Sequence, residues 1–365
     1  MYKGHFVIDA VGHTYDFSAD NRKADVPIEA YNGFIAWLHG YGHVPLEKTS
    51  DGYLLTLDEW AGGWTTKELL DTFFVESGVD MVAMHAVNFY NLFKRGANPW
   101  EQCLAVKEAA PDRVLLYAAV DPLSDRMAEF EKMAEAAERG INGFKFYPVS
   151  GLIDARNHAI SYSFADDAIY PYFEFARSLG VKHMAIHKAV PTGPGPNKHD
   201  RPDDVAAVAA SFPDMTFEVV HSGWAFLEDC AVQMTLNPNV FANLETTANT
   251  IVKMPRRFAR AVGTLLAVAP DRVLFGSGAP LTHPQPIIEA IADFKMPADL
   301  VDEGFPEFTD EVKANLLGLN MARLHDIDVA VAQSTIQDDE WSETRRVYEA
   351  EGRPPWARKR RRITG

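Results

Sequence analysis

The stretch that decides the fold is FVIDAVGH, residues 6–13. An apolar run leads into a short loop that carries a histidine. Strands covered on both faces of a parallel sheet are continuously hydrophobic, whereas half-exposed strands alternate. Similar runs recur along the chain, at residues 80–86, 114–120, 143–148, 182–188, 217–223, 240–246 and 273–279. We therefore predict eight buried parallel strands.

The segments between these runs have helical patterns. Three of them, residues 65–78, 127–140 and 168–180, end at a glycine, which is the commonest residue just beyond a helix. Alternating strands and helices predict an α/β protein with a (β/α)₈, TIM-type barrel. The alternative is a doubly wound open sheet, which is disfavoured because no glycine-rich phosphate loop follows any strand.

We assign residues 1–328 to the barrel, and two segments lie outside the alternation. Residues 14–66 follow the first strand and contain three tryptophans and two histidines that favour an ordered lid, although a packed satellite core is an equal alternative. Residues 329–365 form a C-terminal extension that ends in PPWARKRRRITG. This tail is either a solvated end or an arm that binds an acidic partner subunit.

Composition narrows the class of protein. The chain has 365 residues, of which 47% are hydrophobic, and its net charge of −16 disfavours a nucleic-acid or anionic-membrane surface. The two cysteines lack the spacing of a metal or disulfide framework, so we expect a reducing, cytoplasmic location. The N-terminal apolar stretch is too short for a signal peptide, and no run of 18 apolar residues could span a membrane.

Histidines recur where the strands end. The active site of a (β/α)₈ enzyme lies at the C-terminal ends of its strands, and His13, His85, His187 and His221 fall at such ends. Any one of them alone is more often a buried core residue. Three on strands one, five and six predict instead a site for a first-row metal ion.

The chain resembles the amidohydrolase superfamily from about residue 6 to residue 328. The resemblance is to the amidohydrolase-related branch that contains aminocarboxymuconate semialdehyde decarboxylase and the resorcylate decarboxylases. It rests on an ordered set of motifs: IDAVGH, GVDMVAMHAV, APDRVLLYAAVDP, GFKFYP, MAIHKAV, FPDMTFEVVHSG, DRVLFGSGAP and NLLGLNMARLHDID.

The resemblance implies roles for three histidines. His13 matches the second histidine of the strand-one pair, His187 the strand-five metal ligand, and His221 the histidine that orients or deprotonates the metal-bound water. Two positions depart from the pattern, because Val11 replaces the first histidine and Gly278 replaces the strand-eight aspartate. Neither side chain can bind a metal, so the usual mononuclear site cannot assemble.

The remaining donors still predict a divalent metal site. His13, His187, His221 and Glu245 are the candidate ligands; three nitrogens with water suit zinc, whereas two histidines with a carboxylate suit iron or manganese. His221 and Lys145 are the candidate catalytic residues, with Lys145 binding a substrate carboxylate or pairing with Glu245. Further candidates at the strand ends are His283, which could instead cap a loop, His85 and Asp9.

Three functions remain open. We favour a metal-binding subunit of a hetero-oligomeric oxygenase with a homologous barrel as its partner, as in the amidohydrolase-related 2-aminoisobutyrate hydroxylase. The alternatives are an autonomous metal-dependent hydrolase or decarboxylase and an inactive structural subunit. The expected substrate is a small anionic or zwitterionic metabolite.

Overall fold

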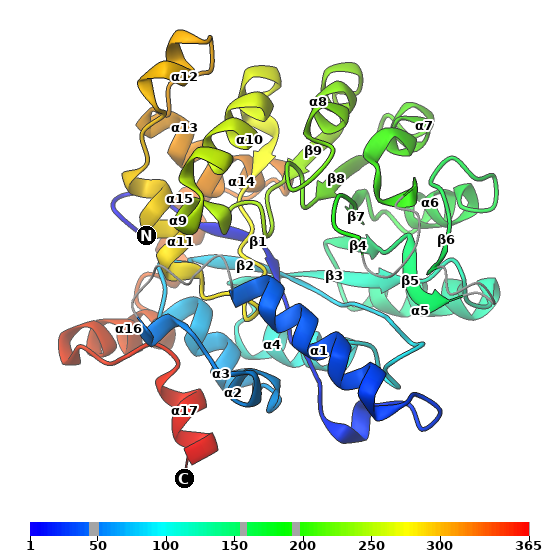
Figure 1. Ribbon diagram of the computed structural model, residues 1–365, viewed down its shortest axis with the longest axis horizontal. Helices are drawn as coiled ribbons and strands as arrows, with labels where there is room; N and C mark the ends of the chain where they lie inside the picture. The colour runs from blue at the N-terminus through cyan, green and yellow to red at the C-terminus, as the bar shows by residue number, and fades with distance from the viewer. Residues whose placement is uncertain (44–50, 154–158, 192–197, 365) are drawn as a thin grey trace.

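The computed structural model describes residues 1–43, 51–153, 159–191 and 198–364. Eight parallel strands form one sheet in the order β1-β2-β3-β4-β7-β8-β9-β10 (Figure 1). Their bounds are β1 Ile8–Gly12, β2 Met81–His85, β3 Val114–Val120, β4 Gly143–Phe146, β7 His183–His187, β8 Thr216–Val220, β9 Val240–Asn243 and β10 Val273–Leu274. Residues just after β10 close the sheet onto β1, since Ala10 N donates to Phe275 O (2.8 Å) and Gly278 N to Val11 O (3.0 Å). The predicted (β/α)₈, TIM-type barrel is confirmed.

Helices cover the outside of the barrel (Figure 1). The three glycine-terminated patterns fold as helices, the first as α3 (Thr66–Leu70) continued by the π-helical segment η4 (Asp71–Val75). The second and third patterns are α5 (Arg126–Glu138) and α6 (Tyr170–Ser178). The other covering helices are α4 Trp100–Ala109, α7 Val205–Ser211, α8 Leu227–Leu236, α9 Thr250–Lys253, α10 Pro255–Val268, α11 Pro284–Asp293, α12 Ala298–Asp302, α13 Asp310–Ala314, η8 Asn315–Leu319 and α14 Asn320–Leu324.

The core has two parts. The larger part lies between the strands and the helices and includes Phe144 and Phe146 of β4, both fully buried. Full burial of such a side chain stabilises the fold by about 1.5–3 kcal/mol. The smaller part fills the barrel interior with side chains such as Ile8, Ala83 and Ala185. The barrel is therefore a packed core whose open end alone can hold a ligand.

The segment after β1 forms a helical cover. It contains α1 (Ile28–His43) and α2 (Leu57–Ala61), and residues 44–50 between them lie outside the described part. Trp60 of α2 is fully buried and donates its indole N–H to Pro280 O, at 2.9 Å. This hydrogen bond ties the cover to the chain just after β10. A hairpin of β5 (Val149–Ile153) and β6 (Ala159–Ser161) follows β4.

Residues 329–364, here called the C-terminal arm, fold back on their own chain as α15 (Val329–Ile336), α16 (Glu340–Glu351) and α17 (Ala357–Thr364). The basic side chains of α17 have partners within the chain. Arg362 Nε lies 2.6 Å from Glu68 Oε1, and Arg358 pairs with Asp71. In this structure the arm therefore binds the acidic residues of its own α3 and η4.

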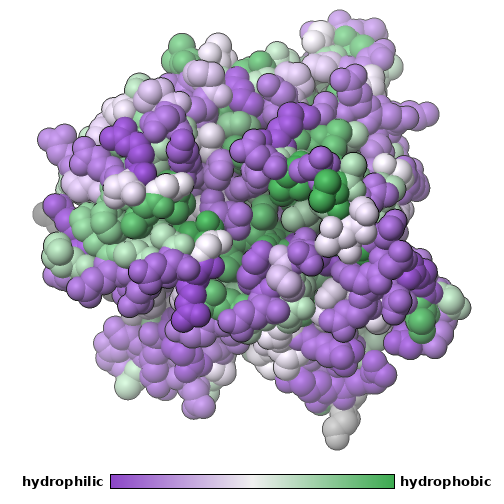
Figure 2. Space-filling model, turned by 180° about the vertical axis from the view of Figure 1, so that it is seen from behind, coloured by the Kyte–Doolittle hydropathy of each residue, from purple (hydrophilic) through white to green (hydrophobic). Residues whose placement is uncertain are grey.

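The exterior is mixed in polarity. The face opposite to the view of Figure 1 is hydrophilic over most of its area, with hydrophobic side chains gathered between polar ones (Figure 2). None of the described helices is long and apolar enough to cross a membrane.

Candidate active site

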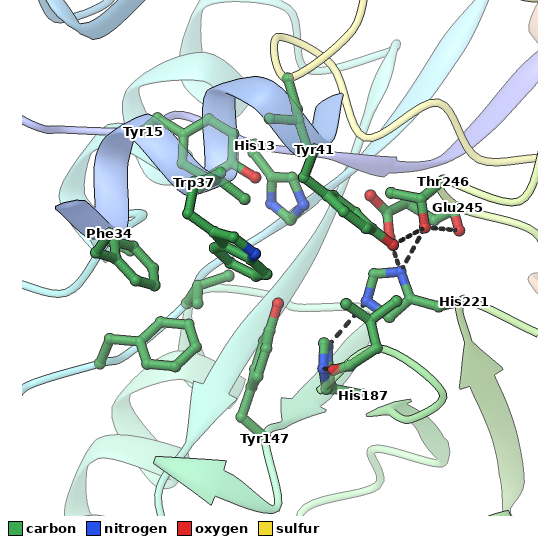
Figure 3. A pocket seen from close by; sticks show the side chains of 16 residues that line it. His13, Tyr15, Phe34, Trp37, Tyr41, Tyr147, His187, His221, Glu245 and Thr246 are labelled. Carbon is green, nitrogen blue, oxygen red and sulfur yellow. Dashed lines mark hydrogen bonds and ion pairs between the residues drawn. The ribbon is translucent and has the colours of Figure 1, made fainter. Parts of the chain in front are cut away.

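A cavity opens at the C-terminal end of the barrel, beneath α1. Its empty volume, part of which is open to solvent, is about 510 Å³, and it is lined by residues that follow seven of the eight strands and by residues of α1. His13, His187, His221 and Glu245 line it from the strand ends, whereas Phe34, Trp37 and Tyr41 line it from α1 (Figure 3). The structure thus brings together all four side chains that the sequence proposes as metal ligands.

Two histidines and a carboxylate form a hydrogen-bonded chain. His187 Nε2 lies 2.6 Å from Val190 O, and a carbonyl can only accept, so Nε2 carries the hydrogen. His187 Nδ1 is then an acceptor and receives the Nε2–H of His221, at 2.8 Å. On its other side, His221 Nδ1 contacts Glu245 Oε2 and lies 3.0 Å from Thr246 Oγ1 (Figure 3).

In this series of hydrogen bonds, one proton is shared between Glu245 and His221 Nδ1. Burial raises the pKa of Glu245 to about 7. Burial, assisted by the charge of Lys145, holds the pKa of His221 well below its ordinary value. Both shifts place the shared proton on Glu245, so the neutral pair is favoured over the ion pair.

His13 is oriented differently. Asn98 Oδ1 accepts the backbone N–H of Tyr15, at 3.0 Å, which fixes the orientation of the amide. Asn98 Nδ2 therefore donates to His13 Nδ1, at 2.6 Å. Burial lowers the pKa of His13 to about 4, so the ring is neutral and carries its hydrogen on Nε2. A metal ligand has the opposite arrangement, with a lone pair toward the ion and an N–H toward an acceptor.

Glu245 occupies the space that a side chain at position 278 would need. Gly278 has φ +72°, and a Cβ atom built on it would overlap Glu245 Oε1. A carboxylate from the end of β9 therefore lies where a side chain on the strand-eight position would lie. The sequence indicated the loss at Gly278 and the acid at Glu245, and the structure shows that the two are spatial alternatives.

The backbone around the cavity is strained. Non-glycine residues with positive φ follow several strand ends, among them Tyr15, Phe89, Ala189, His221 and Thr246. Such conformations cost of order 1–3 kcal/mol each and cluster at functional sites. At His221 (φ 68°) the unusual conformation belongs to the central member of the hydrogen-bonded chain.

Four other predicted residues lie away from the cavity lining. Lys145 points into the barrel, with Nζ 5.0 Å from the centre of the Tyr147 ring, and burial lowers its pKa to about 7. His85 is buried and stacks on Tyr117 at 4.4 Å. Glu245 pairs with His221 instead of Lys145, the partner considered in the sequence.

Asp9 and His283 have structural positions. Asp9 accepts hydrogen bonds from Ser277 N (2.9 Å) and Ser277 Oγ (2.5 Å), which fastens β1 to the segment after β10. His283 caps the N-terminus of α11, where its Nδ1 accepts from Gln285 N at 3.2 Å. The loop-cap alternative for His283 agrees with this position.

Several residues of the site carried no signal in the sequence. Asn98 sets the tautomer of His13, Thr246 contacts His221, and Tyr147 stacks on His187 at 4.3 Å. Asn98 comes from the loop after β2, so only the folded chain places it beside the first strand.

Two groups could hold a metal ion: His187 Nδ1, once the ion replaces the N–H of His221 that it accepts here, and the carboxylate of Glu245, once it gives up the shared proton. Across the described residues, no three His, Cys, Asp or Glu side chains converge as they would around a metal ion. The arrangement thus fits two protein donors and not the four of the usual site.

Comparisons with known proteins show which family profile and which solved structures the chain matches. The sequence profile of the amidohydrolase family, described as "Amidohydrolase", matches residues 72–327. A search of curated proteins returned no match.

Solved structures share the fold at low identity. An uncharacterised TIM-barrel protein from Bordetella bronchiseptica has a TM-score of 0.58 and 18% identity, over 89% of this chain and 99% of that one. The 5-carboxyvanillate decarboxylase of Sphingomonas paucimobilis has a TM-score of 0.52 and 14% identity, over 89% and 100%. The enzyme of that name from Novosphingobium aromaticivorans, complexed with manganese and 4-hydroxy-3-methoxy-5-nitrobenzoic acid, has a TM-score of 0.51 and 13% identity, over 89% and 97%.

Proposed function

The chain belongs to the amidohydrolase family, and within that family we propose that it is a metal-dependent lyase or hydrolase of small carboxylic acids, with decarboxylation the favoured reaction. The metal-containing decarboxylase among the structural relatives supports this alternative over the oxygenase subunit that the sequence favoured. The oxygenase and partner-subunit hypotheses stay predictions, because none of the comparisons with known proteins tests for a redox-active metal or for a second polypeptide in this protein.

The observation that carries the proposal is the carboxylate of Glu245 in the space beside Gly278. It restores an acidic group to the metal-binding end of the barrel although the strand-eight aspartate is missing. We assign His187 Nδ1 and Glu245 as the donors to a divalent zinc, iron or manganese ion. Bound there, the ion would polarise a substrate carboxylate as a Lewis acid.

The residues around these donors have separate roles in the proposal. His221, held by Glu245 and Thr246 at Nδ1, presents Nε2 as the atom that transfers a proton. In decarboxylation, the electrons of the broken C–C bond stay on the substrate carbon and carbon dioxide leaves. That carbon takes the proton of His221 Nε2, while His221 Nδ1 takes the proton shared with Glu245, so the ring is left neutral.

His13 and Lys145 complete the proposed site. His13 offers its Nε2–H to a substrate oxygen, and Asn98 fixes the ring for this contact. The buried Lys145 balances negative charge, since the carboxylates of Glu245 and Glu218 act on it from within the barrel.

Metal titration of the chelator-treated chain tests the proposal. We expect the parent chain to bind about one Mn²⁺ or Zn²⁺ by calorimetry. Glu245→Gln should lower that affinity at least about tenfold, the lower end of the losses seen even for residues that only orient ligands. Glu129→Gln is the matched control, because Glu129 is another buried carboxylate and lies outside the cavity lining.

A swap of the carboxylate sharpens the test. Gly278→Asp alone should disturb the site, because its Cβ overlaps Glu245 Oε1. Glu245→Gly combined with Gly278→Asp should recover metal binding, and aspartate tolerates a positive φ better than most residues. Metal binding that is unchanged in Glu245→Gln, or absent from the parent, would contradict the assignment. Release of carbon dioxide from a panel of small acids then distinguishes decarboxylation from hydrolysis.

A further inference from the structure

Aromatic rings surround the cavity as a nearly continuous belt. On α1, Tyr41 stacks on Trp37 at 5.7 Å, and Trp37 lies 5.9 Å from Phe34. Phe34 contacts Phe89 at 5.8 Å, and Phe89 meets Tyr147 edge-on at 5.1 Å. These rings come from three separate segments, and all of them line the cavity; Phe34, Trp37, Tyr41 and Tyr147 are labelled in Figure 3.

The belt closes through the histidines. Tyr147 stacks on His187, and the rings of His187 and His221 lie 4.5 Å apart. Thr246 then contacts both His221, at 3.0 Å, and the hydroxyl of Tyr41, at 3.4 Å. The cavity wall is therefore mostly π-faces and ring edges.

The ionisable side chains of the described cavity wall include an acid but no lysine or arginine. Among the described lining residues, Glu245 is the single carboxylate, and none is a lysine or arginine. A wall built for an anion alone would place basic or N–H-rich side chains along its length. A ring of aromatic faces with one acid is instead the arrangement that attracts organic cations, because each ring has a negative face.

We propose that the substrate of this cavity carries an ammonium group, which the aromatic belt binds, so that it is a small zwitterion rather than a simple acid. The proposal rests on the function assigned above, since it names the substrate class of the same site. The carboxylate end is directed to His13 and the metal donors, and the ammonium end to Phe34, Trp37 and Phe89.

The test compares probes that share a head with three methyl groups and differ in charge, by calorimetry at pH 8 in chelator. Choline is the cation, 3,3-dimethyl-1-butanol is its neutral isostere, and pivalate carries the same tert-butyl shape on an anion. We expect choline to bind at least about tenfold more tightly than the alcohol, a difference of about 1.4 kcal/mol. Pivalate should bind most weakly.

Variants identify the surface responsible. Trp37 is 43% exposed on α1, so Trp37→Leu should fold normally, and we expect it to remove most of the preference for choline. Tyr90→Leu is the control, because Tyr90 is a similarly exposed aromatic residue that does not line this cavity. Circular dichroism checks the fold of both variants.

Equal or tighter binding of the alcohol or of pivalate would overturn the proposal. The absence of choline binding at about 10 mM, tenfold above a Kd of about 1 mM, would overturn it as well. The metal titration fails or succeeds independently, because the probes are tested without metal. A preference for choline without metal binding would leave the cation site standing and reject the metal-dependent function.

Discussion

The cavity and the C-terminal arm hold their ionisable groups in opposite ways. Around the cavity, Glu245 and the histidines are buried and have hydrogen-bond partners. Burial raises the pKa of Glu245 and lowers the pKa values of His13 and His221, so the neutral form of each group is favoured. In the arm, Arg358 and Arg362 form ion pairs with Asp71 and Glu68. The difference indicates that the cavity keeps groups able to exchange protons, whereas the arm uses charge to hold chain segments together.

The largest effect is expected at Arg113, the buried arginine that holds the C-terminal arm against the barrel. Arg113 is 1% exposed; its guanidinium pairs with Asp339 at 2.6 Å and donates to Ile336 O at 3.0 Å. Arg113→Met leaves these groups without their donor, so we expect the free energy of unfolding in urea to fall by about 3–5 kcal/mol. A loss similar to that of the exposed control Arg256→Met would show that the arm is not anchored in this way.

A pH measurement at Asp9, a buried acid outside the cavity lining, tests whether burial in the barrel favours the neutral form of an ionisable group. Burial raises the pKa of Asp9 to about 7, above its unfolded value near 4. Below pH 4 both states hold the proton. Between about pH 4 and 7 the unfolded state has released it while the folded state keeps it, so rising pH removes stability through this window.

Asp9→Asn resembles the protonated acid and should remove this contribution. The stability of the parent relative to Asp9→Asn should fall by about 2–3 kcal/mol between pH 5 and pH 8, in urea melts at each pH. The asparagine can still accept from Ser277 N and Val11 N, the two backbone donors to Asp9 Oδ1. A difference that is constant with pH would mean that Asp9 is ionised in the folded chain throughout.

A third test concerns backbone strain at the cavity. Ala189 has φ +64° directly after the strand that ends at His187. Because glycine adopts this conformation without steric strain, Ala189→Gly should stabilise the protein by about 1 kcal/mol. Ala209→Gly, within the regular helix α7, is the matched control and should destabilise by about 1 kcal/mol. Destabilisation of both variants to the same extent would argue against stored strain.

The sequence predicted the barrel and the convergence of the four proposed ligands because both follow from strand spacing. It placed Asp9 among the site candidates, but side chains alternate along β1, so Asp9 points away from the interior that Ile8 and Ala10 face. His283 follows the last strand, yet it begins a helix at Pro284 and turns to cap it. The tautomer of His13 depends on Asn98, a contact across 85 positions that no local pattern reveals.

The smallest change in stability is expected at Arg362, an exposed residue of the C-terminal arm. The basic residues of the tail were evident from the sequence, but their partners were not. Acidic residues of the same chain and acidic residues of another chain would form the same ion pairs. Arg362 is 40% exposed on its side chain, and water and salt screen its pair with Glu68. Arg362→Gln should therefore lower the free energy of unfolding by less than about 1 kcal/mol, and by less still in 1 M salt. A larger effect that depends on protein concentration would mean that the arm also bridges two copies of the chain, because stability linked to association varies with concentration.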